Sequence, residues 1–231
     1  HPIIDLKLNP KDVLTVGYVF LAMAFMAGIY LFLLVGWPVF VLAIAGLIIG
    51  VGYSIPPLKF HYRGYGEVLA ALAMGPLVTW GSYIVQTGIY TNPAPLIVGL
   101  PNGLFTLLIL IGSGALELDA CRAVGKITLV LLVGVRNTRY VVYASIAIMY
   151  LAIVFSAILH YLPYISLISL LLIPRTLRLA GPLLSGDEYV VRSRWKELRN
   201  LWAGPFSVRL VMLIIFIASM IIARAYPPLS V

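Results

Sequence analysis

The sequence is poor in cysteine, histidine and charged residues, and each shortage excludes a class of protein. Cys121 is the only cysteine, so no disulfide can form within the chain. The three histidines, His1, His61 and His160, lack the spacing of metal ligands and do not predict a histidine-based metal site. Charged residues make up 10% of the chain and hydrophobic residues 62%, a composition that excludes a soluble globular domain.

Long apolar runs take the place of the missing charges. Most of them approach the ~20 residues that a helix needs to cross a bilayer. The sixth run continues past Pro174 as a kinked helix through Leu184, and Asn9 with Pro10 predicts the start of the first helix. We therefore predict an all-α fold, a polytopic bundle of about seven transmembrane helices in a single membrane domain over residues 1–231. The runs cover residues 13–36, 38–54, 68–87, 95–116, 139–159, 162–174 and 207–226.

The placement of the basic residues predicts how this bundle sits in the membrane. If the spans alternate in direction, all of the 16 Lys and Arg residues except Arg224 fall on one side. The turns on the other side, at residues 36–38, 88–95 and 160–163, contain none. By the positive-inside rule the basic loops are cytoplasmic, in a multi-pass protein of the cell membrane. The net charge of +8 is thus a sign of topology, and we expect no nucleic-acid partner.

Two polar loops interrupt the apolar runs, and both are predicted on the cytoplasmic side. The first polar loop, residues 53–67, is charged and rich in Gly and Pro, and the second polar loop, residues 117–126, follows one helical hairpin later. A polar loop between membrane-length helices is a place where a membrane enzyme can hold the charged head of a substrate.

Several motifs follow one another in a fixed order along the chain. In their order and spacing they resemble the UbiA superfamily of intramembrane prenyltransferases, and most closely its branch that acts on 1,4-dihydroxy-2-naphthoate in menaquinone biosynthesis. The resemblance implies that the spans correspond to the last seven of the family's nine helices, without the first two and the first aspartate-rich motif. The motifs are His1-Pro-Ile-Ile4, Leu8-Asn-Pro-Lys11, Tyr53-Ser-Ile-Pro-Pro-Leu-Lys59, Arg63-Gly-Tyr-Gly-Glu67, Gly75-Pro-Leu77, Tyr83-Ile-Val-Gln-Thr-Gly88 and Asp119-Ala-Cys-Arg-Ala-Val-Gly-Lys-Ile-Thr-Leu129.

The resemblance implies Mg²⁺-dependent transfer of a polyprenyl group from polyprenyl diphosphate to an aromatic acceptor such as 1,4-dihydroxy-2-naphthoate. Mg²⁺ and basic side chains stabilise the diphosphate as it departs. The resemblance makes Tyr53 and Glu117 candidate catalytic residues, and Glu117 and Asp119 candidate metal ligands. The candidate diphosphate-binding residues are Lys59, Arg63, Arg122 and Lys126.

The second aspartate motif departs from the pattern of the family. Where relatives have N-N-x-x-D-x-x-x-D, this chain has Ser113, Gly114, Glu117 and Cys121. A regular helix would put Glu117 and Cys121 on one face, but a thiol is a poor substitute for a carboxylate on Mg²⁺. Asp119 would contribute only where the helix unwinds. A second hypothesis therefore stays open, namely a degenerate, non-catalytic paralogue that binds isoprenoids or membrane partners.

Three further side chains, Trp80, Tyr83 and Gln86, lie at helical spacing on one broad face of the third span and are candidate lining residues of the substrate cavity. Gln86 would hydrogen-bond either a quinoid acceptor or a neighbouring helix. We interpret Glu67, at the start of the same span, as a helix-dipole partner without a catalytic part. A transporter is a less favoured alternative, because the polar residues gather at the cytoplasmic ends of the helices and not at the membrane midplane.

Overall fold

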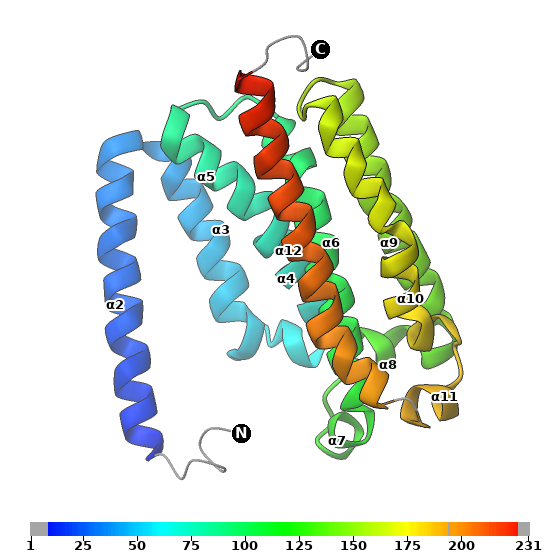
Figure 1. Ribbon diagram of the computed structural model, residues 1–231. Helices are drawn as coiled ribbons and strands as arrows, with labels where there is room; N and C mark the ends of the chain where they lie inside the picture. Colours follow the sequence, from blue (N-terminus) through cyan, green and yellow to red (C-terminus); the bar gives the residue numbers. More distant parts are fainter. Residues whose placement is uncertain (1–8, 194, 226–231) are drawn as a thin grey trace.

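The computed structural model describes residues 9–193 and 195–225, and this part of the chain is built from helices without a β-strand (Figure 1). The N-terminal motif residues 1–8 lie outside it. The α-helices are α2 (Pro10–Val35), α3 (Trp37–Ser54), α4 (Gly66–Leu72), α5 (Val78–Thr87), α6 (Ala94–Leu116), α7 (Leu118–Ala123), α8 (Leu129–Val133), α9 (Val135–Ile158), α10 (Ile173–Leu184), α11 (Glu188–Ser193) and α12 (Trp195–Ala225). The described residues also include the 3₁₀ segments η1 (Phe60–Tyr62) and η3 (Tyr164–Leu172) and the π-helical turn η2 (Ala73–Leu77).

Seven helical stretches of the described chain are long and apolar enough to cross a membrane, which confirms the predicted fold class of a polytopic helical bundle. The chain is therefore a multi-pass membrane protein. The stretches are Lys11–Val35, Trp37–Ser54, Gly66–Thr87, Ala94–Leu116, Val135–Ile158, Tyr164–Leu184 and Ser207–Ala225.

The local chemistry explains where some of these helices begin and change. Asn9 caps α2 as predicted, because its Oδ1 accepts a hydrogen bond of 3.1 Å from the Lys11 backbone N–H, and Pro10 takes the first helical position. The third span contains the π-helical turn η2, which includes Pro76 and which the sequence analysis did not predict. The sixth span continues to Leu184 as predicted, but Pro174 lies in the first turn of α10, where the chain changes from a 3₁₀ to an α-helix.

The helices are packed very unevenly. Residues of α6, α9, α10 and α12 form an apolar core in which Phe105, Ile111 and Met149 are at most 1% exposed. The third span approaches α6 closely, and a Cβ atom added to Gly75 would lie 2.5 Å from the Gly103 Cα atom. In contrast, no residue in the apolar stretch of α2 is buried. This helix stands at the edge of the molecule beside α3 (Figure 1).

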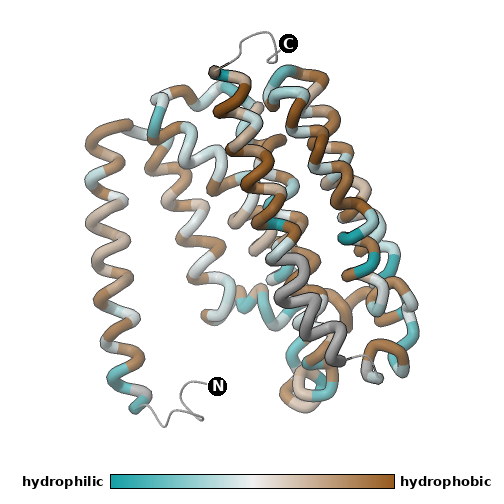
Figure 2. Tube along the Cα trace, viewed as in Figure 1, coloured by the Kyte–Doolittle hydropathy of each residue, from teal (hydrophilic) through white to brown (hydrophobic). Residues whose placement is uncertain are grey.

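Both polar loops emerge at the same end of the bundle. Figure 2 shows hydrophobic residues along most of the helices and hydrophilic residues at the end that holds η1 and α7. The turns at Gly36, between α5 and α6 and between α9 and η3 lie at the opposite end (Figure 1). The bundle thus has one basic end and one end almost without basic residues, as the alternation of the spans predicts.

Candidate active site

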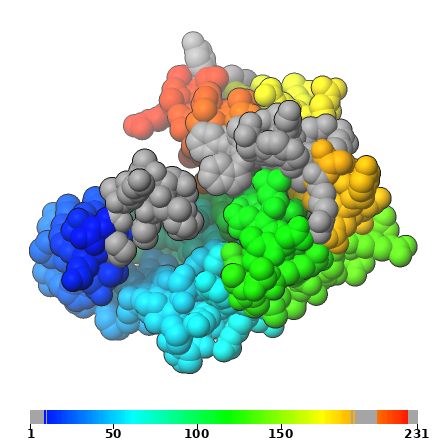
Figure 3. Space-filling view, turned by 90° about the horizontal axis from the view of Figure 1, so that it is seen from below, coloured from blue at the N-terminus to red at the C-terminus, as the bar shows by residue number. Residues whose placement is uncertain are grey.

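The two polar loops are joined to each other by backbone hydrogen bonds. The Ile127 N–H donates to the Tyr62 carbonyl oxygen over 3.1 Å, and Arg63 and Ile127 form a parallel bridge. In Figure 3, which views this end, the cyan segment around η1 and the green segment around α7 lie side by side. Residues separated by a helical hairpin, which consists of two spans and the turn between them, therefore form one continuous surface.

The first polar loop presents two cations without a carboxylate partner among the described residues. Lys59 has a left-handed backbone, with φ 44° and ψ 47°, and its Nζ lies 5.8 Å from the centroid of the Tyr62 ring. One guanidinium nitrogen of Arg63 donates to the Pro57 carbonyl oxygen over 2.9 Å, just after the cis Pro56–Pro57 peptide bond. Both charges are therefore held by their own loop and stay available to an anion.

Tyr53 and His61 stack on each other within the first polar loop. Their ring centroids are 4.7 Å apart and the rings are inclined by 17°. The stack depends on Gly66, because a Cβ atom there would lie 2.8 Å from the His61 Cα atom and 3.2 Å from the Tyr53 ring. Burial lowers the pKa of His61, the Lys126 ammonium lowers it as well, and Glu67 and Glu117 act in the opposite direction. The imidazole is accordingly neutral at neutral pH.

The second polar loop begins with a break in the helix. Helix α6 ends at Leu116, Glu117 has φ −99° and ψ 14°, and α7 starts at Leu118. The Cys121 N–H donates to the Glu117 carbonyl oxygen over 2.8 Å, as in a regular helical turn, but Glu117 is exposed whereas Cys121 is 3% exposed. Burial raises the pKa of the Cys121 thiol, which disfavours the thiolate that would bind a metal.

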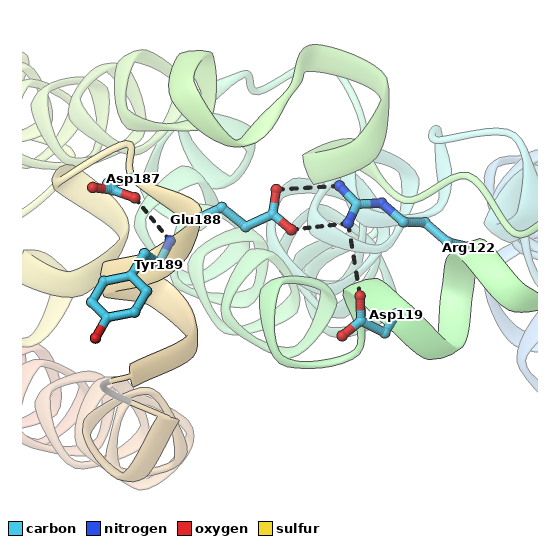
Figure 4. A network of polar contacts seen from close by, with 5 residues as sticks. All are labelled: Asp119, Arg122, Asp187, Glu188 and Tyr189. Carbon is cyan, nitrogen blue, oxygen red and sulfur yellow. Dashed lines mark hydrogen bonds and ion pairs between the residues drawn. The ribbon is translucent and has the colours of Figure 1, made fainter.

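Arg122 is already paired with carboxylates (Figure 4). Its guanidinium meets Glu188 of α11 in a bidentate pair, with N–O distances of 2.9 and 3.3 Å, and lies 3.7 Å from an Asp119 oxygen. The hydrogen bond to Glu188 raises the pKa of Arg122 further. Glu188 lies 66 residues further along the chain, and no pattern in the sequence pointed to it.

Lys126 lies at the end of the second polar loop, directly before Ile127, whose N–H binds the first polar loop. The chain reaches it through the left-handed residue Gly125, and the Lys126 N–H donates to the Cys121 carbonyl oxygen over 2.9 Å. The side chain is half-buried, and its charge lowers the pKa of His61 in the first polar loop. No carboxylate pairs with it in the part of the chain that the structure describes, so Lys126 joins Lys59 and Arg63 as an available cation.

The predicted metal ligands offer the oxygen donors that Mg²⁺ prefers, but few of them. Within residues 9–193 and 195–225 no group of three or more His, Cys, Asp or Glu side chains could hold a metal ion. Glu117 is exposed, and Asp119 lies in the network with Arg122. Mg²⁺ commonly binds through one or two carboxylates and the phosphates of a substrate, so the number of carboxylates here suits a site shared with a diphosphate and not a closed protein site.

The three candidate cavity residues do not converge with the two polar loops. Trp80 and Tyr83 are half-buried on α5, Gln86 is exposed, and the Tyr83 hydroxyl accepts a hydrogen bond of 3.2 Å from Asn92. Tyr83 lies roughly 24 Å along the span from Glu67, at 1.5 Å per residue. These side chains therefore belong to the opposite half of the bundle.

Next to the cations lies an apolar groove that the sequence analysis did not identify. Its volume is about 260 Å³, and it ends at the residue that precedes Lys59. The lining combines the last turns of α3 with the Pro-Pro turn. The lining residues are Leu47, Ile48, Val51, Gly52, Ile55, Pro56, Pro57 and Leu58.

Comparison with known proteins confirms the family. The model of the UbiA prenyltransferase family matches residues 1–202, and the chain belongs to this family. It is 23% identical over 147 residues to the 1,4-dihydroxy-2-naphthoate octaprenyltransferase of Bacillus subtilis, which is 64% of this chain and 47% of the relative.

Two further relatives point in the same direction. The enzyme of the same description from Mycobacterium tuberculosis is 28% identical over 181 residues, 77% of this chain and 60% of its own length. The 2-carboxy-1,4-naphthoquinone phytyltransferase of Synechocystis is 24% identical over 188 residues, 78% of this chain and 58% of its own length. The chain spans about half the length of the curated relatives it matches. No solved structure matches it.

Proposed function

We propose that this member of the UbiA family transfers a polyprenyl group from polyprenyl diphosphate to an aromatic ring, with 1,4-dihydroxy-2-naphthoate or a similar naphthoate of menaquinone biosynthesis as the acceptor. The family and the printed activities of the relatives support the reaction class. The observation that carries the proposal is the set of three cations, Lys59, Arg63 and Lys126, on two joined loops beside an apolar groove.

The three cations suit the leaving group of this reaction. A departing diphosphate gains negative charge, and fixed positive groups that face it stabilise the transition state more than the ground state. Arg63 uses one nitrogen on the Pro57 carbonyl oxygen and keeps its other donors for an anion. Arg122 has a smaller part, because its two terminal nitrogens already meet Glu188.

The groove suits the isoprenoid tail. All of its lining side chains are apolar, and its end adjoins Lys59, so a prenyl chain in the groove would bring its diphosphate to the cations. Tyr53 stands one turn before the Pro-Pro turn and stacks on His61. We assign its hydroxyl to orienting the diphosphate and its ring to the wall beside the allylic carbon.

A Mg²⁺ ion would be held by Glu117 and Asp119 together with the diphosphate, and when bound it would neutralise charge on the leaving group. Glu117 is free to turn toward the ligand because it is exposed at the break between α6 and α7. We place this end of the bundle on the cytoplasmic side of the cell membrane, on the strength of its basic residues.

The test is a prenylation assay with the protein in lipid nanodiscs, polyprenyl diphosphate, Mg²⁺ and either 1,4-dihydroxy-2-naphthoate or 4-hydroxybenzoate. We expect a prenylated naphthoate that disappears with EDTA, and no product from the benzoate. A product from the benzoate alone would overturn the assignment of the acceptor.

The second hypothesis, a non-catalytic isoprenoid-binding paralogue, is favoured by one observation. The Cys121 thiol is buried, at a position where the resemblance to the family implies a metal-binding aspartate. Binding of polyprenyl diphosphate without turnover of either acceptor, in the same nanodiscs, would decide for it.

A further inference from the structure

Glu67 is the only acidic side chain in the buried core of the described chain, with 2% of its surface exposed. It lies in the first turn of α4, directly after Gly66. A helix-dipole partner at this position needs only to be near the helix start, and such residues are ordinarily solvated. The burial of Glu67 therefore needs another explanation.

One oxygen of Glu67 binds the start of a different helix. Oε1 accepts a hydrogen bond of 3.0 Å from the Leu129 N–H, 62 residues away. Leu129 is the first residue of α8, and the N-cap residue Thr128 accepts from Leu131 over 3.4 Å. Since the first N–H groups of a helix have no partner within the helix, Glu67 completes the cap of α8 from outside. The contact ties the end of the first polar loop to the chain just after the second.

The other oxygen of Glu67 and one ring nitrogen of His61 are both left without a hydrogen-bond partner in the described chain. Oε2 is buried without a hydrogen-bond partner within the described residues, and so is Nδ1 of His61. The place of a Gly66 Cβ atom is 3.0 Å from that Nδ1, and the Glu67 charge acts on the His61 ring. A neutral imidazole carries one N–H, and a buried carboxylate oxygen requires a donor.

We propose that Glu67 is a positioning residue that fastens the two polar loops into one unit. Oε1 holds the Leu129 amide, and Oε2 accepts a hydrogen bond from one water that in turn accepts from Nδ1–H of His61. Lys126 precedes Leu129 by three residues and Arg63 precedes Glu67 by four, so the fastening sets the distance between cations of the two loops. The functional part of this inference rests on the proposed diphosphate site, whereas the fastening itself is measurable without it.

Hydrogen exchange separates this role from a helix-dipole role. We expect Glu67→Ala to raise the exchange rate of the Leu129 amide by about tenfold or more, because the amide loses its acceptor. Glu67→Gln should leave the rate near that of the wild type, since the amide oxygen still accepts, whereas a dipole role needs the negative charge. Asp12→Ala is the matched control, because Asp12 lies in the first turn of α2. Equal rates in Glu67→Ala and the wild type, or equal effects of Ala and Gln, would overturn the proposal.

A proline variant tests the same contact from its donor side. Proline is tolerated at the first position of a helix and has no N–H, and Thr128 already has the extended backbone that precedes proline well, with φ −90° and ψ 166°. In a Leu129→Pro background, Glu67→Ala should lower the Tm far less than it does in the wild type. Leu129→Ala is the control, because it removes the side chain and keeps the N–H. If Glu67→Ala lowers the Tm as much in the Leu129→Pro background as in the wild type, the contact between Glu67 and the Leu129 amide is contradicted.

Ligand binding then tests the consequence for the site. With polyprenyl diphosphate as the ligand, Glu67→Ala should raise the Kd by about tenfold and Glu67→Gln by less than about threefold. In a protein that turns over, the same change should appear in KM and not in kcat. If Glu67→Ala loses hydrogen-exchange protection of the Leu129 amide but keeps the Kd of the wild type, only the functional part of the proposal is refuted. A wild type that binds no diphosphate would instead refute the proposed function, and the exchange data would still decide the fastening.

Discussion

The two polar loops carry the same number of candidate cations but hold them differently. In the first polar loop, Lys59 faces the ring of Tyr62 and Arg63 donates to a backbone carbonyl oxygen. In the second polar loop, Arg122 is engaged by Glu188 and Asp119, and only Lys126 is without a carboxylate partner in the described chain.

The difference teaches that a basic residue in a motif is not equally useful for binding an anion at every position. An arginine in a bidentate carboxylate pair must give up that pair before it can bind a diphosphate, so it contributes only the difference between the two interactions. A cation held by a ring or a carbonyl oxygen loses much less. We therefore expect the first polar loop to dominate binding and the second to adjust it.

The largest expected effect follows removal of both cations of the first polar loop. Lys59→Ala with Arg63→Ala should lower kcat/KM for polyprenyl diphosphate by about 10²–10³-fold, because two donors to the leaving group are lost. The measurement is prenyl transfer in nanodiscs. Lys11→Ala, which removes a charge from the exposed first turn of α2, is the control and should change kcat/KM by less than twofold, or about 0.4 kcal/mol. An equal loss in control and double variant would remove the distinction between the loops.

A smaller effect is expected when the Tyr53–His61 stack in the first polar loop is disturbed. Gly66→Ala places a Cβ atom 2.8 Å from the His61 backbone, so the Tyr53–His61 pair must shift. We expect a loss of about 1–3 kcal/mol in the free energy of unfolding and a tenfold lower kcat/KM, or about 1.4 kcal/mol. Gly17→Ala in α2, where a Cβ atom has no neighbour within 4 Å, is the control and should be neutral or stabilising. A neutral Gly66→Ala would show that the stack does not support the site.

The paired arginine should matter less. We expect Arg122→Gln to raise the Kd for polyprenyl diphosphate by about threefold or less, and Glu188→Gln to lower it by a similar factor, because the guanidinium is then released. A double-mutant cycle on thermal unfolding should give a small favourable coupling for this partly exposed pair. An Arg122→Gln effect as large as that of the Lys59 and Arg63 variant would overturn the comparison.

The smallest effect concerns pH. The pKa of His61 in the folded protein lies below its ordinary value of 6.5, so the unfolded chain binds more protons between the two values. Stability should therefore rise with pH through this window below 6.5 and fall as the pH is lowered. His61→Phe keeps an aromatic partner for Tyr53 and should flatten the dependence of Tm on pH between about 5 and 7. An unchanged slope in this variant would assign the dependence to other groups.

Much of the architecture followed from composition and spacing. The runs of apolar residues predicted every membrane-length helix of the described chain, and the pair Asn9 and Pro10 predicted the start of α2. These features depend on local physics, since a bilayer requires long apolar helices and a helix start requires an acceptor. The π-helical turn at Pro76 was not predicted, and beside it Gly75 approaches Gly103 of a different span closely.

The candidate site was predictable only in part. The motifs placed cations and carboxylates in two polar loops, but they did not show that Arg122 meets Glu188 or that Cys121 is buried while Glu117 is exposed. Such outcomes depend on contacts between segments far apart in the chain, for which one sequence has no periodic signal.

By itself, the sequence determined that this protein spans a membrane several times, that its basic loops share one side and that its motifs are those of the UbiA family. Hydrophobicity and charge act on each segment separately, so these properties can be read residue by residue. Only the tertiary structure decided which cations remain available and that Glu67 is enclosed against α8. Burial and pairing arise when distant segments meet, and the same carboxylate that is a solvated helix partner in one environment is a buried link between two loops in another.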